Sequence, residues 1–240
     1  MRVAMHQPHY LPWLGYLDKI DRSDLFVVLD HVQYERKGWQ NRNYLASKDG
    51  PVLLTVPVVQ RSRNERILDK QVDNSQQWRL KHQRSIAEHC YPNAPHWEEF
   101  GPAFAAIYER EWQRLDELAL ATTYALLRGF GITTPVVRSS ELGEFPGQKS
   151  ELLAQIAAKT GASSMLSGDG ARGYVDEEVF RRYGIGVTWQ NFQHPTYDQF
   201  CRRGQDFLPR LAAVDLLFNQ GSAALQTLRR ARGAAESTTG

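Results

Sequence analysis

The sequence has few cysteines, no long apolar run and almost no net charge, and each absence excludes a class of protein. Its two cysteines, Cys90 and Cys201, lie far apart and outside any CxxC or Cys/His spacing, which excludes the usual zinc signatures and favours a reducing compartment. No apolar run approaches the roughly 18 residues that cross a bilayer. The 29 basic and 27 acidic residues leave a net charge of +2, which argues against nucleic acid and membrane surfaces as partners. We therefore expect a soluble, cytoplasmic protein.

Several familiar motifs are absent as well. The chain contains no HExxH, no Walker loop and no GxGxxG pattern, so no motif specifies a metal or a cofactor, and we expect no metal site. The N-terminal residues do not form the unbroken apolar core of a targeting signal, because polar residues interrupt them from His6 onward. With 240 residues, of which 42% are hydrophobic, we predict one domain over residues 1–233 and a disordered tail at 234–240.

Strand and helix patterns alternate along most of the chain. This alternation predicts an α/β fold with a Rossmann-like, mostly parallel sheet, a helical insertion at about 76–130 and a helical C-terminus at 211–232. The β-α-β start is the clearest part, since "DLFVVLD" reads as a buried parallel strand. The predicted strands are residues 2–5, 24–30, 52–59, 133–138, 164–166 and 186–190, and the predicted helices outside the insertion are 11–21 and 150–160.

The first polar loop, "HQPHYLPW", follows the first predicted strand directly. Loops at the carboxyl ends of parallel strands line the ligand crevice of such sheets. His6 and His9 are candidate catalytic residues, because imidazole titrates near neutral pH, and Gln7, Tyr10 and Trp13 are candidate substrate-binding residues. The alternative is structural: the histidines cap the strand and helix ends while Tyr10 and Trp13 pack beneath them.

The second polar loop, "DHVQYERKGWQNRN", follows the second strand. Asp30, at the carboxyl end of that strand, is the third candidate catalytic residue. The segment offers amides, aromatic faces and cations for a substrate, and a solvated surface loop is the alternative. The candidate substrate-binding residues in it are Gln33, Tyr34, Trp39, Gln40, Asn41 and Arg42.

Three further segments carry weaker signals. "SGDGA" follows a short strand, so Ser167, Gly168, Asp169 and Gly170 are candidates for binding an anion through backbone N–H groups, or they form a tight turn that needs glycine. The remaining candidate substrate-binding residues are Ser139, Ser140, Lys81 and His82, with a turn and a solvated helix face as the alternatives.

The order of these motifs resembles the WbqC-like family of bacterial proteins. The resemblance covers about residues 1–221 and rests on "HQPHYLPWLGYLDKI", "SDLFVVLDHVQYERKGWQNRN", "LLTVPV", "WRLKH", "SSELG", "LSGDGARGYVDEEVF" and "AAVDLLFNQG". Members of the family are often encoded among genes for surface-glycan or natural-product assembly, and the resemblance implies such a context here.

A second resemblance, at the level of the fold, is to the HIGH-motif nucleotidylyltransferases such as pantothenate synthetase. In those enzymes a His-x-Gly-His sequence opens the first helix and stabilises charge at the α-phosphate. Gly15 matches this pattern, but Trp13 and Tyr16 occupy the two histidine positions. The absence of these two histidines argues against direct adenylyl transfer, unless His6 and His9, which lie one turn earlier in the chain, take over their role.

These observations favour a transferase that uses an activated anionic donor, nucleotide-linked or acyl-linked, to modify an amino sugar or an amino acid. The alternatives are a nucleotidylyltransferase or adenylate-forming ligase that uses ATP, and a non-catalytic subunit of a biosynthetic complex. A nucleotide with Mg²⁺ is the cofactor compatible with this chemistry. The expected partners are a small-molecule substrate and its donor, and a carrier protein or a second copy of the chain is a further candidate partner. Nucleic acid is disfavoured as a partner, because the sequence contains no basic stripe.

Overall fold

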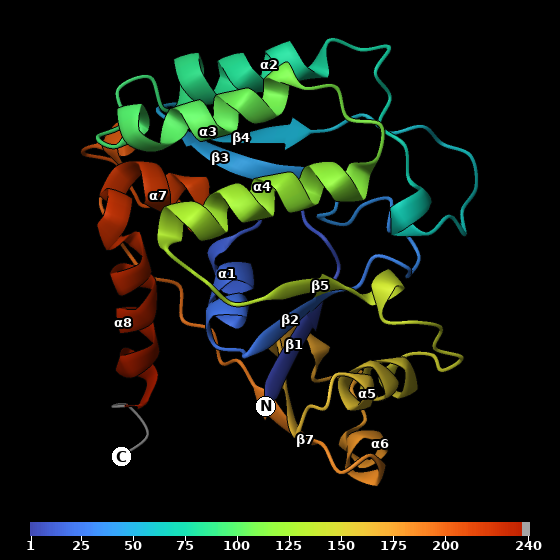
Figure 1. The fold of residues 1–240 in the computed structure, drawn as a ribbon. Helices are drawn as coiled ribbons and strands as arrows, with labels where there is room; N and C mark the ends of the chain where they lie inside the picture. Colours follow the sequence, from blue (N-terminus) through green and yellow to red (C-terminus); the bar gives the residue numbers. More distant parts are fainter. Residues whose placement is uncertain (237–240) are drawn as a thin grey trace.

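The computed structural model describes residues 1–236, with side chains as far as Arg232. Its centre is a five-stranded parallel sheet in the order β5-β2-β1-β6-β7 (Figure 1). The strands are β1 (Arg2–His6), β2 (Leu25–Val28), β5 (Val136–Arg138), β6 (Ser164–Ser167) and β7 (Gly186–Trp189). The predicted α/β fold with a mostly parallel sheet is therefore confirmed, including the adjacent, parallel placement of the first two strands.

Alternating side chains of β1 and β2 fill two separate cores, because successive residues of a strand point to opposite faces. On one face Val3 and Val27 pack with α5 (Ser150–Lys159) and α6 (Glu177–Arg182). On the other face Ala4 and Phe26 pack with α1 (Leu14–Asp21). Covering both faces requires the continuous apolar strands that the sequence shows.

The segment between β2 and β5 forms a lobe above the sheet. It contains an antiparallel hairpin, β3 (Arg42–Ser47) and β4 (Gly50–Thr55), then α2 (Trp78–Arg84), the π-helix Ser85–Cys90, α3 (Trp97–Glu109) and α4 (Leu115–Phe130). Figure 1 shows α4 lying between the hairpin and the carboxyl ends of the strands. The strand predicted at 52–59 is β4, but it pairs outside the central sheet, and β3 was not predicted because its sequence, "RNYLAS", reads as polar loop.

The C-terminal part is helical, as predicted. Helix α7 (Val214–Gln220) is followed by Gly221, whose φ of +56 favours glycine and whose missing Cβ leaves room for the His96 ring, and then by α8 (Ala224–Glu236). Arg229 and Arg232 of α8 pair with Asp21 and Asp18 of α1. The predicted disordered tail overlaps α8 at 234–236, and its remaining residues, 237–240, lie outside the described residues.

Short 3-10 helices complete the fold at Ile67–Asp69, Ser139–Glu141, Asp169–Ala171, Phe200–Arg202 and Gly221–Ala223. No helix within residues 1–236 combines the length and apolarity needed to cross a membrane.

Candidate functional site

The strand order places a topological switch point beside β1. The chain leaves β1 toward β2 on one side, and β6 joins β1 from the other side, so the loops after β1 and β6 diverge at the carboxyl edge. Ligands of open α/β sheets bind at this position. The loop after β1 holds His6 to His9, and the loop after β6 holds Gly168 to Gly170, so the switch point brings two sequence-predicted segments together.

Four side chains at this edge form what we call the His–Tyr–Lys cluster: His6, His9, Tyr16 and Lys19. The ring centroids of His6 and His9 are 4.5 Å apart, and Tyr16 stacks on His9 at 5.3 Å. Tyr16 and Lys19 come from α1, which leaves them 1% and 6% exposed. The cluster therefore consists of two sequence-predicted histidines and two residues that sequence reasoning did not assign to a site.

Burial makes both histidines weak bases. It lowers the pKa of His9 to about 3, and the positive charge of Lys19 adds to the effect. Burial, Lys19 and His9 together hold the pKa of His6 well below its usual range. His6 Nδ1 lies 3.0 Å from the carbonyl oxygen of Gln7, which can only accept, so Nδ1 carries the proton and Nε2 keeps a free lone pair.

Lys19 supplies the positive charge of the cluster. Burial lowers the pKa of its ammonium to about 8, against the opposing influence of Asp169 and Asp18. A Cβ built on Gly168 would lie 3.2 Å from Lys19 Nζ, which places the ammonium beside the loop that follows β6. Burial also raises the pKa of Tyr16, so its hydroxyl stays protonated and can donate.

Buried polar atoms without a hydrogen-bond partner are concentrated near this edge. Among the described residues all six belong to positions 9–42, and they are His9 Nδ1, Tyr16 Oη, His31 Nε2, Gln40 Oε1, Asn41 Oδ1 and Arg42 Nε. Buried polar groups in proteins are normally paired, so a cluster of unpaired groups indicates hydrogen-bonding capacity kept for something else.

The loops after β1 and β2 are interlocked. Gln40 Nε2 donates to Gln7 Oε1 at 2.6 Å, and Asn43 Nδ2 donates to the carbonyl oxygen of Leu11 at 2.5 Å. Leu11 has a φ of +47, which a leucine rarely adopts, and a bond from its N–H to Thr122 of α4 helps to hold it there. The predicted binding residues Gln7 and Gln40 thus lie side by side, whereas Asn41 Nδ2 donates to the carbonyl oxygen of Val56.

Asp30, predicted to be catalytic, is instead bound into an ion-pair network. It is 0% exposed, and its carboxylate accepts hydrogen bonds from Arg138 Nε at 2.7 Å, Ser139 Oγ at 2.9 Å and Ser140 Oγ at 2.6 Å. Burial would raise the pKa of Asp30, but the bonds from Ser140, Arg138 and Ser139 outweigh it and lower the pKa. Asp30, Ser139 and Ser140 therefore satisfy one another and are not presented to a ligand.

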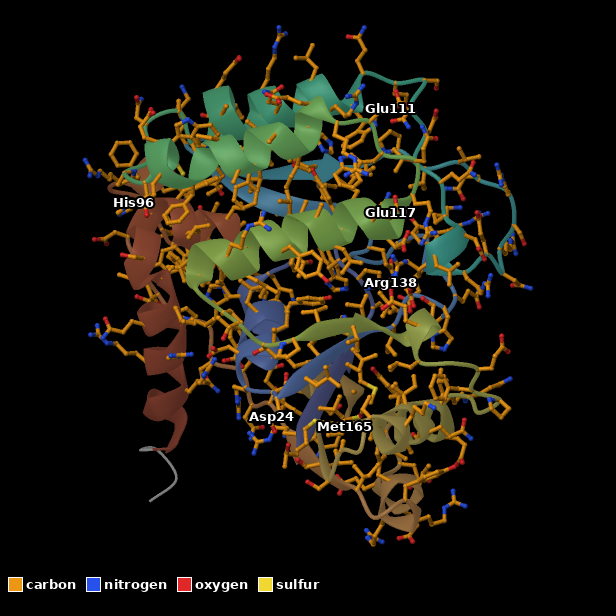
Figure 2. The ribbon with its side chains drawn as sticks, viewed as in Figure 1. Asp24, His96, Glu111, Glu117, Arg138 and Met165 are labelled. Atoms are coloured by element: carbon orange, nitrogen blue, oxygen red, sulfur yellow. The ribbon has the colours of Figure 1, made fainter. Side chains whose placement is uncertain are left out.

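Arg138 extends this network to a second buried carboxylate, Asp116 of α4, which also pairs with Arg114. Figure 2 shows Arg138 at the end of β5, beneath the first turn of α4. Ser139 Oγ also contacts His31 Nδ1 at 2.5 Å. The network thus fastens the helical lobe to the carboxyl edge of the sheet.

The structure separates Lys81 and His82 from the switch point and buries Tyr10. The hydroxyl of Tyr10 lies 2.8 Å from His82 Nδ1 and 2.5 Å from the hydroxyl of Tyr108, inside the helical lobe. Lys81 and His82 line an open surface pocket of about 910 Å³ together with residues of β4 and α2. Figure 1 shows β4 and α2 in the lobe above the sheet. Tyr10 and His82 form a buried polar pair of the lobe, and their predicted role in substrate binding stays a prediction.

The other predicted residues lie around the edge in different environments. Trp13 covers Gly15 and meets Phe192 edge-on at 5.1 Å, and Asp169 accepts from the backbone N–H groups of Asn191 and Phe192. Ser167 is buried.

The predicted residues of the loop after β2 are in part buried and in part bound to backbone carbonyl groups. Tyr34 lies buried beneath Lys70 Nζ, and Arg42 Nη2 donates to the carbonyl oxygen of Arg36. Gln33 donates to the carbonyl oxygen of Arg63, and Trp39 is 45% exposed.

Sequence reasoning missed Lys19, Tyr16 and Gln190. Gln190, at the end of β7, donates from Nε2 to the carbonyl oxygen of Gly15 and to Asp18 Oδ2, both at 2.7 Å. The sequence offered one signal for Lys19. The residue lies in a short helix that connects two central strands, and such a helix packs closely against the sheet, so a charged residue within it becomes buried.

Acid is expected to destabilise the protein through His9. Its pKa is about 3 in the folded state and about 6.5 when unfolded, so the unfolded state binds more protons once the pH falls below 6.5. Between pH 7.5 and pH 5 this linkage removes about 2 kcal/mol of stability. Urea unfolding of wild type and His9→Gln at both pH values measures it, and an equal loss in the two proteins would contradict the assignment.

These features define a class: an α/β protein with a parallel sheet and an unsatisfied polar cluster at the switch point of its carboxyl edge. The chain belongs to the WbqC-like protein family, whose model matches residues 7–227. It is 34% identical over 233 residues to the uncharacterized protein Rv1507c of Mycobacterium tuberculosis, an alignment that covers 96% of this chain and 99% of that protein. No solved structure matches the chain. The family predicted from the ordered motifs is therefore confirmed.

Proposed function

We propose that the protein is a cytoplasmic transferase that binds an activated anionic donor and modifies an amino sugar or amino acid in surface-glycan or natural-product biosynthesis. The observation that carries this proposal is the set of unpaired buried polar atoms at positions 9–42, which includes His9 Nδ1 close enough to the cationic Lys19 to feel its charge. A polar ligand with negative charge supplies acceptors for the unpaired donors, such as Tyr16 Oη, and compensates the ammonium, while hydroxyl or amine groups of the same ligand supply donors for the amide oxygens of Gln40 and Asn41.

His6 is the proposed general base, because its lowered pKa keeps the ring neutral at pH 7 and so leaves Nε2 able to accept a proton. Its Nε2 lone pair accepts the proton of the acceptor's amine or hydroxyl while the nitrogen or oxygen of that group attacks the donor. One bond forms between the acceptor and the transferred group, and the bond between that group and the donor's leaving group breaks. The electron pair departs with the leaving group, whose negative charge the nearby Lys19 stabilises.

A nucleotidylyltransferase or ATP-dependent ligase is the second candidate, and Lys19 is the observation that favours it. Trp13 and Tyr16 stand where the HIGH enzymes carry histidines, but Lys19 lies one helical turn after Gly15 and supplies a cation to the same edge. Pyrophosphate exchange into ATP distinguishes the two, because only the ligase or nucleotidylyltransferase reaction includes that step. A non-catalytic subunit would bind ligand and show neither reaction.

The test begins by identifying the donor. Native mass spectrometry of the purified protein, with thermal shifts against nucleotides, nucleotide sugars and acyl donors, selects the donor for a transfer assay on amino sugars and amino acids. His6→Asn is the informative variant, because its side-chain amide can still donate to the Gln7 carbonyl while Nε2 is lost.

We expect His6→Asn to reduce the transfer rate by roughly 10²- to 10⁴-fold, the usual contribution of a general base, with donor affinity retained. His89→Gln, at an exposed position of the π-helix, serves as the matched control and should transfer at the wild-type rate. A His6→Asn protein that transfers as fast as wild type would remove His6 from the mechanism.

A further inference from the structure

Lys19 is a largely buried cation whose ammonium has no hydrogen-bond or ion-pair partner among the described residues. The residue is 6% exposed, and its carbonyl oxygen, unlike its ammonium, is bonded, because it accepts from Ser23 Oγ. The two nearest carboxylates are already engaged: Asp18 accepts from Arg232 and Gln190, and Asp169 accepts from Arg172 and from two backbone N–H groups. The side chain of Lys19 is nearly covered while its ammonium keeps a small accessible surface and no bond within the described residues, so the ammonium is placed to meet a ligand that supplies a partner.

The loop after β6 lies open toward this ammonium. The backbone N–H groups of Gly168, Asp169 and Gly170 donate no hydrogen bond to the described residues. Gly168 has an ordinary φ of −75, so its backbone does not demand glycine, yet any Cβ there would stand 3.2 Å from Lys19 Nζ. Glycine at this position therefore keeps free the space between the loop and the ammonium.

We propose that Lys19 and the backbone of Gly168 to Gly170 together bind a phosphoryl or pyrophosphoryl group of the ligand. This inference rests on the proposed function and narrows its donor class to phosphorylated molecules. The ammonium offers donors on one side and the loop offers N–H groups on the other, an arrangement that suits the several oxygens of a phosphate.

The arginines of this edge argue for phosphate over carboxylate. A planar carboxylate is best bound by the fork of an arginine, whereas lysine binds phosphate as a point charge. Arg22 Nη1 donates to the carbonyl oxygen of Gln190, and Arg172 pairs with Asp169 and Asn191. Both guanidinium groups thus already bind groups of the protein, whereas the lysine ammonium binds none.

The experiment uses the full chain and inorganic pyrophosphate as the probe, with binding followed by calorimetry. We expect pyrophosphate to bind wild type and to bind Lys19→Met about 10- to 100-fold more weakly, the loss of one or more charge-assisted hydrogen bonds. Lys159→Met, at an exposed position of α5, is the control and should bind as wild type does. Malonate, tested in parallel, should bind much more weakly than pyrophosphate.

Two further measurements make the geometry testable. Gly168→Ala places a methyl group beside Lys19 Nζ and should weaken pyrophosphate binding at least tenfold, whereas Gly173→Ala, with open space around its Cβ, should not. Wild-type affinity should also fall roughly tenfold between pH 7 and pH 9 as Lys19 loses its proton, although pyrophosphate itself becomes more negative over that range.

Three results would overturn the inference: no pyrophosphate binding to wild type at millimolar concentration, equal affinity in Lys19→Met, or malonate binding as tightly as pyrophosphate. Different results would count against the transferase proposal. Pyrophosphate binding that depends on Lys19, without transfer to any acceptor, would support the phosphoryl site and count against the transferase. Transfer that survives Lys19→Met unchanged would refute the phosphoryl site and the role of Lys19 at the leaving group, and it would leave the transferase assignment standing.

Discussion

Replacing Arg138 by methionine is expected to destabilise the protein by about 3–5 kcal/mol, the usual loss when one partner of a buried ion pair is removed. Asp30 and Asp116 are both 0% exposed, and Arg138 bridges them. Without the guanidinium, Asp30 keeps only its serine and backbone donors, and Asp116 keeps only Arg114. Urea unfolding at pH 7 measures the change in the free energy of unfolding.

The matched control for this variant is Arg128→Met, at an exposed position near the end of α4, which should change stability by less than about 0.5 kcal/mol. The loss in Arg138→Met should also shrink in acid. Asp30 has a lowered pKa when folded, so its stabilising contribution is present above the unfolded pKa and disappears as the pH falls through the folded value. A loss below 1 kcal/mol at pH 7 would show that the network is dispensable.

Replacing Lys19 by methionine is expected to raise the free energy of unfolding. Lys19 has a pKa of about 8 in the folded protein and an ordinary value of 10.5, and below pH 8 this difference lowers the stability of wild type by about 3 kcal/mol. Methionine keeps most of the length of the side chain and removes the buried charge. Urea unfolding at pH 7 should therefore show Lys19→Met to be the more stable protein.

The pH dependence of this gain has a definite sign. Between pH 8 and pH 10.5 the unfolded state binds more protons than the folded state, so wild type gains stability as the pH rises. The difference in the free energy of unfolding between Lys19→Met and wild type therefore falls, to roughly half at pH 9.5. Lys159→Met should show no gain at either pH. A Lys19→Met protein that is less stable than wild type would indicate that the ammonium has a partner that offsets its burial.

The two expected results describe opposite uses of buried charge. Asp30 and Arg138 hold the lobe on the sheet, and each satisfies the other. Lys19 lies at the switch point and is satisfied by no described residue, so a protein selected for stability alone would replace it. Natural proteins retain such destabilising residues where function requires them.

The sequence by itself determined the frame of the protein. The apolar run "LFVVL" and the β-α-β start specify covered parallel strands, because only a strand buried on both faces needs continuous apolar residues. The polar residues from His6 to His9 and from Asp30 onward follow those strands, so their position at the carboxyl edge follows from the local pattern. The order of the motifs also determined the family.

Only the tertiary structure decided which polar side chains have hydrogen-bond partners within the protein and which do not. Asp30 and Arg138 are separated by 108 residues, and Asn43 reaches Leu11 across 32, so no local pattern could show that these groups satisfy one another. The same holds for β3, whose polar sequence becomes a strand because β4 and the Leu211–Val214 segment pack against it. Lys19 could be recognised as an unpaired cation only once the partners of Asp18 and Asp169 were known. The periodicity of a sequence predicts which face of a helix or strand a residue occupies, but it does not predict which residues from distant parts of the chain contact it.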